Sequence, residues 1–342
     1  MKKESPDYVR TSLAAAMTLG FKKGWFYRDA KLPCINLLLT YSSGCMGNCG
    51  YCGLSMRRPG GYIEKSFIRV EWPTYPLDDI IKQIATRKDT VKRVCVSMIT
   101  NKQAIQDTMK ITETLSQTLN IPVSLLVSPT ILKKEHLVLF KQSGADMIGI
   151  AIDCSTPDLF ANIRGKGVSG PHKWDQYWKC YTEAIEIFGK RKVGVHLIVG
   201  LGETEKEMIE TIQKAYDLGG STHLFSFYPE KDSALADKLQ PPIGQYRRIQ
   251  LARYLIDEGI SSINEFRFDS SERLIDFGQA DETLDQVISS GLPFMTSGCP
   301  DDEGRVACTR PYANGPPGEE IRNYAFQPNN QDIALIKEQI WR

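Results

Sequence analysis

The stretch "CINLLLTYSSGCMGNCGYCGLSMRRPGG", residues 34–61, joins an apolar run to a glycine-rich loop. Its first eight residues, 34–41, are apolar enough to predict a buried β-strand. Three cysteines follow in the loop, Cys45, Cys49 and Cys52, with the spacing C-x3-C-x2-C. A buried strand therefore leads directly into a polar loop that carries three thiols.

The rest of the chain repeats the same strand-first pattern. Amphipathic, helix-patterned segments occupy 77–87, 108–119, 206–219 and 246–259, and the apolar runs that predict strands occupy 34–41, 91–100, 122–129, 147–153, 192–203, 222–229 and 264–270. Strands that alternate with helices at this spacing predict a parallel sheet with crossover helices. Six or seven such repeats predict an α/β fold that forms a full or partial (β/α) barrel.

Composition changes divide the chain into three expected parts. Residues 1–33 are predicted to form a helical extension, and residues 34–291 form the barrel. Residues 292–342 are rich in Gly and Pro and predict an irregular tail that wraps the barrel and ends in a short helix.

Charge and cysteine content restrict the class of protein. The formal charge is +1, so neither nucleic acid nor an acidic membrane surface is an expected partner. The N-terminal apolar run is short and broken, and no stretch has 18 apolar residues, so neither a signal peptide nor a membrane span is expected. We therefore expect a cytoplasmic protein, in which nine cysteines indicate metal or redox chemistry rather than disulfides.

The three-cysteine loop predicts an iron–sulfur site at the carboxyl-terminal rim of the barrel, where the active sites of such folds lie. Three thiolates can hold three irons of a [4Fe–4S] cube and leave the fourth iron open. Structural zinc is the competing interpretation, but it requires four closed ligands, and no nearby His or fourth Cys completes the set.

This loop resembles that of the radical S-adenosylmethionine (SAM) superfamily, in which an aromatic residue, here Tyr51, precedes the last cysteine. The resemblance implies that the open iron binds SAM, which is then cleaved to methionine and a 5′-deoxyadenosyl radical. It also implies cofactor contacts from "IVGLGET" (198–204) and "IAIDCST" (150–156), namely from Ile198, Gly200, Glu203 and Asp153. The alternatives are an ordinary tight turn for the first segment and a helix-capping Asp for the second.

Period-two alternation predicts which side chains face the barrel lumen. The inward set is unusually polar and includes Cys34, Asn36, Arg93, Cys95, His196 and Arg267. A polar lumen indicates a bound substrate or cofactor, so His196 and Arg267 are candidate substrate contacts; a satisfied buried polar group is the alternative for each. The layout is similar to that of biotin synthase, whose second cluster occupies positions matched by Cys95 and Arg267. Gly194 stands where that enzyme has a ligand cysteine, so a [2Fe–2S] cluster of that type is not expected.

The tail carries a second pair of cysteines, Cys299 and Cys308, in the stretch "SGCPDDEGRVACTRPY". Paired cysteines in an irregular segment favour metal ligation over packing. A cube needs a further ligand, which the inward-facing Cys34 or Cys95 can supply; Cys34 is preferred. Cys154 and Cys180 are interpreted as structural.

The motifs together resemble one biotin-synthase-like branch, the two-component lipoyl synthases of archaea and anaerobic bacteria. The similarity extends from "NLLLTYSSGC" to "CTRPYANGPPG" and "RNYAFQP". It implies a second, auxiliary [4Fe–4S] cluster whose sulfide is inserted at C6 or C8 of an octanoyl chain. The implied partners are an octanoylated carrier protein (a lipoyl domain or a glycine-cleavage H-type protein), a paralogous radical SAM subunit, and a reductant such as ferredoxin or flavodoxin.

The sequence leaves two other functions open. A relative of the hydrogenase maturases or of methylornithine synthase would not need Cys299 and Cys308 as part of a sulfur donor. An iron–sulfur electron carrier or scaffold would need neither an open iron nor a polar lumen.

Overall fold

A curved sheet of eight strands forms the centre of the protein, whose computed structural model describes residues 2–312 and 320–342. Six of these strands are parallel and follow one another across the sheet. They are β2 (Cys34–Leu39), β4 (Arg93–Ser97), β5 (Val123–Val127), β6 (Ala145–Asp153), β7 (Val193–Val199) and β8 (Ser221–Ser226). The first and last strands of the sheet do not pair, so the predicted α/β fold is confirmed in its partial-barrel form.

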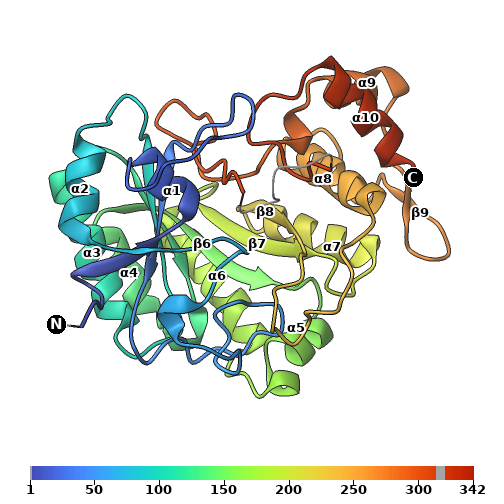
Figure 1. Cartoon of the computed structure of the whole chain (residues 1–342). Coiled ribbons are helices and arrows are strands. Elements are labelled where there is room, and N and C mark those ends of the chain that lie inside the picture. The colour runs from blue at the N-terminus through green and yellow to red at the C-terminus, as the bar shows by residue number, and fades with distance from the viewer. Residues whose placement is uncertain (1, 313–319) are drawn as a thin grey trace.

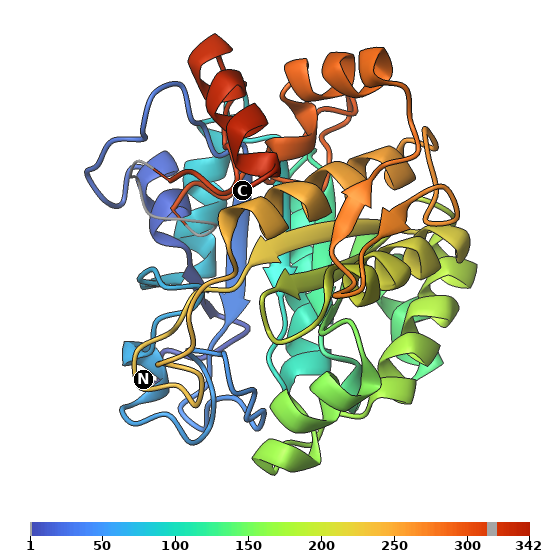
Figure 2. The ribbon, with the colours of Figure 1, turned by 90° about the vertical axis from the view of Figure 1, so that its right-hand side faces the viewer.

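Helices cover the outer face of this sheet (Figures 1 and 2). Those that follow or connect the strands are α2 (Leu77–Ala85), α3 (Ala104–Thr118), α4 (Lys134–Gln142), α5 (Pro157–Ile163), α6 (Trp174–Phe188), α7 (Glu205–Asp217) and α8 (Ile243–Asp257). The helix predictions for 77–87, 108–119, 206–219 and 246–259 are confirmed to within a few residues. Short 3₁₀ turns complete the connections: η1 (Tyr62–Glu64), η2 (Pro129–Ile131), η3 (Lys166–Val168) and η4 (Leu292–Phe294).

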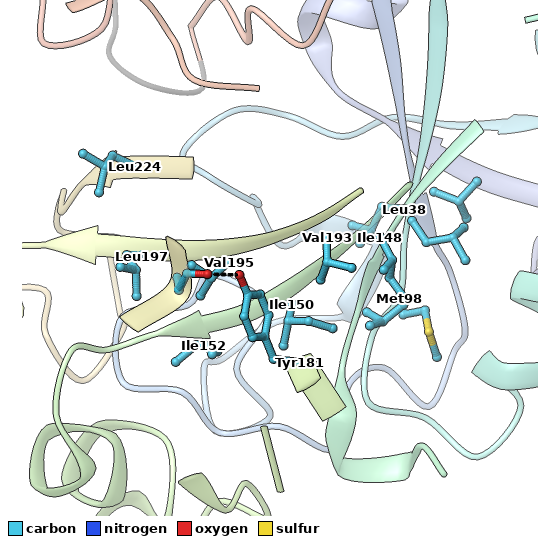
Figure 3. Packing of buried hydrophobic residues seen from close by; sticks show 14 of the residues in the cluster. Leu38, Met98, Ile148, Ile150, Ile152, Tyr181, Val193, Val195, Leu197 and Leu224 are labelled. Carbon is cyan, nitrogen blue, oxygen red and sulfur yellow. Dashed lines mark hydrogen bonds between the residues drawn. The ribbon is translucent and has the colours of Figure 1, made fainter. Parts of the chain in front are cut away.

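The outward face of the central strands packs against the helix layer, as the alternation predicts. Val193, Val195 and Leu197 of β7 are fully buried, and Figure 3 shows them beside Tyr181 of α6. The Tyr181 hydroxyl donates a hydrogen bond to the Ala215 carbonyl (2.9 Å). A Cβ at Gly220 would lie 1.8 Å from that hydroxyl, so only glycine at this position allows α6 to pack closely against the sheet.

The N-terminal part is not the helical extension that the sequence predicts. Its strand β1 (Tyr8–Thr11) pairs antiparallel with both β2 and β3 (Thr74–Pro76), and helix α1 (Leu13–Thr18) follows. Backbone hydrogen bonds to the neighbouring strands outweigh the local helical pattern here, because a buried strand edge needs partners.

The segment 264–270 is also not a barrel strand. Its extended part, β9 (Arg267–Phe268), pairs only with β10 (Leu274–Asp276) in a separate two-stranded sheet. The Arg267 side chain is 77% exposed and ion-pairs with Asp276 (3.7 Å). Its predicted place in the lumen, and with it a substrate contact from inside the barrel, is therefore wrong.

The tail packs across the amino-terminal end of the barrel, after helix α9 (Asp281–Ser289), and ends in α10 (Asn330–Ile340) (Figure 1). Thr309 Oγ1 donates to the Lys31 carbonyl, and the rings of Phe26 and Tyr312 stack at 5.8 Å. The "ANGPPGE" part of the tail motif, residues 313–319, lies outside the described residues. Within the described ranges, no helix is long and apolar enough to cross a membrane.

Candidate functional site

A cavity of about 200 Å³ opens at the carboxyl ends of the parallel strands. Its wall includes Cys45, Cys49 and Cys52, which we call the rim cysteines. Its floor is formed by side chains from the strands, among them Leu38, Leu126, His196 and Phe225. The three-cysteine loop therefore lies at this rim, as predicted.

Each rim cysteine receives at least one N–H group. Gly47 N donates to Cys45 Sγ (3.2 Å), Leu54 N to Cys52 Sγ (3.4 Å) and Arg164 Nε to Cys49 Sγ (3.5 Å). Hydrogen bonds of this kind stabilise thiolates, the form that binds iron. Burial has the opposite effect in the metal-free loop and raises the pKa of Cys45 and Cys52. A bound metal removes those protons, so the donor set fits a cluster held by three thiolates.

A site for a single metal ion would need a different arrangement of ligands from that of the rim cysteines. Among residues 2–312 and 320–342, no three His, Cys, Asp or Glu side chains form a group that could hold one metal ion. Zinc requires its ligands to meet at one point, whereas a cube takes one thiolate on each iron and keeps its ligands apart.

Tyr51, Asp153 and Arg164 form a linked group on the cavity wall. The Tyr51 hydroxyl donates to Asp153 Oδ2, and Arg164 Nη1 ion-pairs with the same oxygen (3.1 Å). Asp153 ends β6 with a left-handed backbone (φ 65°), which turns its carboxylate toward the cysteine loop. Tyr51 and Asp153 thus both lie on the cavity wall near the rim cysteines, and their contact with a cofactor stays a prediction. Arg164 was not predicted, because one arginine after a short helix has no distinguishing pattern.

The turn after β7 is held by its own glutamate. The Glu203 carboxylate accepts hydrogen bonds from the backbone N–H groups of Gly200 (2.5 Å), Leu201 (2.9 Å) and Gly202 (3.0 Å). Gly200 has φ 103°, and a Cβ there would lie 2.6 Å from Pro241 Cδ. Ile198, two residues before the turn, lines the cavity. Glu203 therefore shapes the turn, and cofactor contact from Ile198 and the Gly200 backbone stays a prediction.

Two histidines lie deeper in the lumen. The rings of His196 (β7) and His223 (β8) meet edge to face at 5.3 Å, and a Cβ at Gly194 would lie 2.6 Å from His223 Nε2. Burial lowers the pKa of His196, and lowers that of His223 to about 3, with further lowering from the charge of Arg310. His196 faces the cavity as predicted; His223 was missed, although the same alternation places it inward. It fills the space at Gly194, where the resemblance to biotin synthase expected a cysteine.

His223 should make folding stability depend on pH. Below pH 6.5 the unfolded chain takes up a proton that the folded protein does not, so stability is complete above that pH and falls toward pH 3. For this residue the loss should reach about 2 kcal/mol by pH 5. Urea unfolding of wild type and His223→Gln at pH 8 and pH 5 measures it. We expect the decrease between these pH values to be about 2 kcal/mol smaller in the variant; equal decreases would contradict a neutral buried His223.

A second group of cysteines lies at the opposite, amino-terminal end of the barrel. We call Cys34, Cys95, Cys299 and Cys308 the basal cysteines; the first two belong to β2 and β4, and the others to the tail. Cys34, Cys95 and Cys308 pack in one small cluster with Ala307, apart from the main core. The predicted meeting of the tail pair with an inward strand cysteine is therefore present, and both candidate strand cysteines take part.

The surroundings favour thiolate at one of the four basal cysteines, Cys308, whereas burial raises the pKa of Cys95 and of Cys299. Cys34 and Asn36 Nδ2 hydrogen-bond to Cys308 Sγ, the latter at 3.5 Å. The Cys34 contact, the Arg310 charge and the Asn36 contact lower the pKa of Cys308, whereas the Cys308 contact and burial raise that of Cys34. Among the described residues, Arg310 Nε is buried without a hydrogen-bond partner. The positive charge of Arg310 near Cys308 suits an anionic cluster better than apolar packing.

Cys154 and Cys180 belong to neither group. Both are buried within the main hydrophobic core, which is consistent with their interpretation as structural residues.

Comparison with known proteins agrees with this geometry. The sequence profile of the radical SAM superfamily matches residues 39–215, just over half of the chain. The chain therefore belongs to the radical SAM superfamily, whose members are enzymes that use a [4Fe–4S] cluster with SAM. No curated protein matches the chain.

Solved structures of similar fold include two of the [FeFe]-hydrogenase maturase HydG. The one from Carboxydothermus hydrogenoformans is 14% identical, with a TM-score of 0.51 over 86% of this chain and 74% of that one. The other is 13% identical, with a TM-score of 0.50 over 71% of this chain. The match spans only 53% of that maturase's length. At such identities the likeness concerns the fold alone.

Proposed function

We propose that the protein is a radical SAM sulfur-insertion enzyme of the lipoyl-synthase type. The rim cysteines would hold a [4Fe–4S] cluster with SAM, and the basal cysteines an auxiliary cluster that supplies sulfur. One observation carries this proposal: two separate groups of cysteines lie at opposite ends of the barrel, the rim cysteines on the cavity wall and the basal cysteines in a cluster of their own.

The spacing of the two groups suits a substrate that lies along the barrel axis. Cys34 is the first residue of β2, and the loop with the rim cysteines begins after its last residue, Leu39. Five strand residues at ~3.3 Å each separate the two ends by about 17 Å. The acyl carbon that loses hydrogen must also receive sulfur, so it would have to lie inside the lumen between the two sites rather than on the surface.

The lining of the cavity beside the rim cysteines suits an uncharged chain. Leu38, Met98, Leu126, Ile198 and Phe225 all line the cavity. An octanoyl chain would be desolvated there without leaving a charge unpaired. We therefore propose an octanoyl group, attached to a carrier-protein lysine, as the substrate.

The residues on the cavity wall have defined tasks in this proposal. SAM bound at such a cluster supplies a 5′-deoxyadenosyl radical, which is able to remove hydrogen from an unactivated methylene. Tyr51, Asp153 and Arg164 would orient the cofactor, and the apolar floor would exclude water and hold the acyl carbon near it. His196 stays neutral, so it would pack against the chain or donate one hydrogen bond without adding charge.

The remaining elements of the proposal concern partners. The carrier protein would dock at the rim, where its lysine arm enters the cavity. A paralogous radical SAM subunit would add one of the two sulfurs, and a ferredoxin or flavodoxin would reduce the rim cluster. An electron carrier or scaffold is the less favoured alternative, because it has no use for an apolar cavity beside the cysteines.

Anaerobic turnover with an octanoyl-lysine peptide tests the function. We expect 5′-deoxyadenosine and a thiolated peptide that is about 32 mass units heavier for each C–H converted to C–SH, measured by mass spectrometry with and without the paralogue. A butanoyl-lysine peptide, which has no C6 or C8, is the control. If the octanoyl peptide is thiolated neither with nor without the paralogue, the proposal is wrong.

A further inference from the structure

The basal cysteines come from two independent parts of the fold. On neighbouring strands, Asn36 of β2 stands opposite Cys95 of β4, so Cys34 and Cys95 are inward residues on adjacent strands, close in register. In the tail, the carbonyl of Cys299 accepts hydrogen bonds from the N–H groups of Ala307 (3.0 Å) and Cys308 (3.3 Å). The backbone thus holds the cysteines of each pair near each other.

Polar side chains connect the two pairs. Asn36 Nδ2 lies 3.8 Å from Cys34 Sγ and 3.5 Å from Cys308 Sγ, so it bridges the strand pair and the tail pair. Ser124 of β5 stands opposite Cys95 of β4, and its side chain also lies near Cys299. Asn36 therefore links Cys308 to Cys34, and Ser124 lies close to both Cys95 and Cys299.

Arg93 fixes the tail in this position. Its Nε donates to the Pro300 carbonyl (2.5 Å), next to Cys299. Its two Nη atoms form a bidentate pair with Asp146 (2.6 and 2.7 Å). A bidentate arginine is geometrically rigid, so the tail is held by a specific contact rather than by loose packing.

We propose that Cys95 is a ligand of the auxiliary cluster together with Cys34, Cys299 and Cys308, so that this cluster has four thiolates and no open iron. The inference rests on the proposed auxiliary cluster and adds the number of protein thiolates that hold it. It separates the two sites chemically: the rim cluster has three thiolates and an open iron for SAM, whereas every iron of the basal cluster is already bound by the protein.

The test isolates the basal site. In a Cys45→Ala/Cys49→Ala/Cys52→Ala parent, anaerobic reconstitution should leave about four irons per chain. Mild oxidation should not convert that cluster to a [3Fe–4S] form, because no iron lacks a thiolate. Adding Cys95→Ala should leave one iron unprotected, and the same oxidation should give a [3Fe–4S] electron paramagnetic resonance signal with loss of about one iron of four.

Controls separate ligation from folding. Cys180→Ala, in the core at α6, should behave like the parent. Cys95→Ser keeps the shape of the side chain and should change the signal of the reduced cluster; melting temperatures verify that both Cys95 variants fold. If the parent itself forms [3Fe–4S] readily, or Cys95→Ala leaves iron and signal unchanged, the four-ligand assignment is wrong. If the four-ligand cluster forms but wild type does not thiolate the octanoyl peptide, the assignment stands and the proposed function fails.

Discussion

Replacing Cys45, Cys49 or Cys52 by alanine should lower reductive cleavage of SAM by more than about 1,000-fold, because the rim cluster loses one of three anchoring thiolates. The three side chains line one cavity, and the basal cysteines cannot replace a lost thiolate there, because they lie at the other end of the strands. The measurement is 5′-deoxyadenosine released after chemical reduction, quantified by chromatography.

The fold should survive these substitutions. Cys45 and Cys52 are only partly buried, and the loop is held by backbone contacts such as Met46 N to the Thr100 carbonyl (2.7 Å). Melting temperatures close to wild type, with Cys180→Ala as an active control, would show that the loss is chemical. Near-normal deoxyadenosine from any single variant would refute the assignment of the rim cysteines.

Substituting Cys299 or Cys308 by alanine should have the opposite selectivity. We expect loss of about half of roughly eight bound irons, with SAM cleavage retained and sulfur insertion abolished, because the two clusters perform separate tasks. Iron content, deoxyadenosine and peptide mass, measured on the same sample, distinguish the two functions.

Cys180→Ala is the matched control for this experiment, since Cys180 is buried like Cys308 but lies in the main core. It should retain all its iron and both activities, at some cost in stability from the lost packing. Should the Cys299 and Cys308 variants keep full iron content and still thiolate the peptide, the tail is structural and the lipoyl-synthase proposal fails.

Several features of the site could be predicted because they depend on local sequence. The C-x3-C-x2-C spacing confines three thiols to one loop whatever surrounds it. Strand alternation placed Cys34, Cys95 and His196 inward, because successive side chains of a strand point to opposite faces. Tyr51 and Asp153 lie on the cavity wall for similar reasons, one beside a rim cysteine and one at the end of a strand.

Other features were misjudged or missed because they depend on distant partners. The alternation around Arg267 is that of a β-strand, but its segment pairs with residues 274–276 instead of joining the barrel. Neither face of this strand therefore points into the lumen. Arg164 reaches Cys49 across 115 positions of sequence, and nothing near it in the chain indicates that contact.

The sequence by itself determined the class of fold, the rim cysteines and the presence of a second cysteine pair, because strand pattern and motif spacing are properties of short segments. Only the tertiary structure decided which cysteines meet at the base of the barrel. Residue 34, residue 95 and the tail pair 299 and 308 are far apart in the chain, and their contact depends on strand register and on Arg93 fixing the tail. The choice between Cys34 and Cys95 was open for this reason, and the folded chain brings both to the same place.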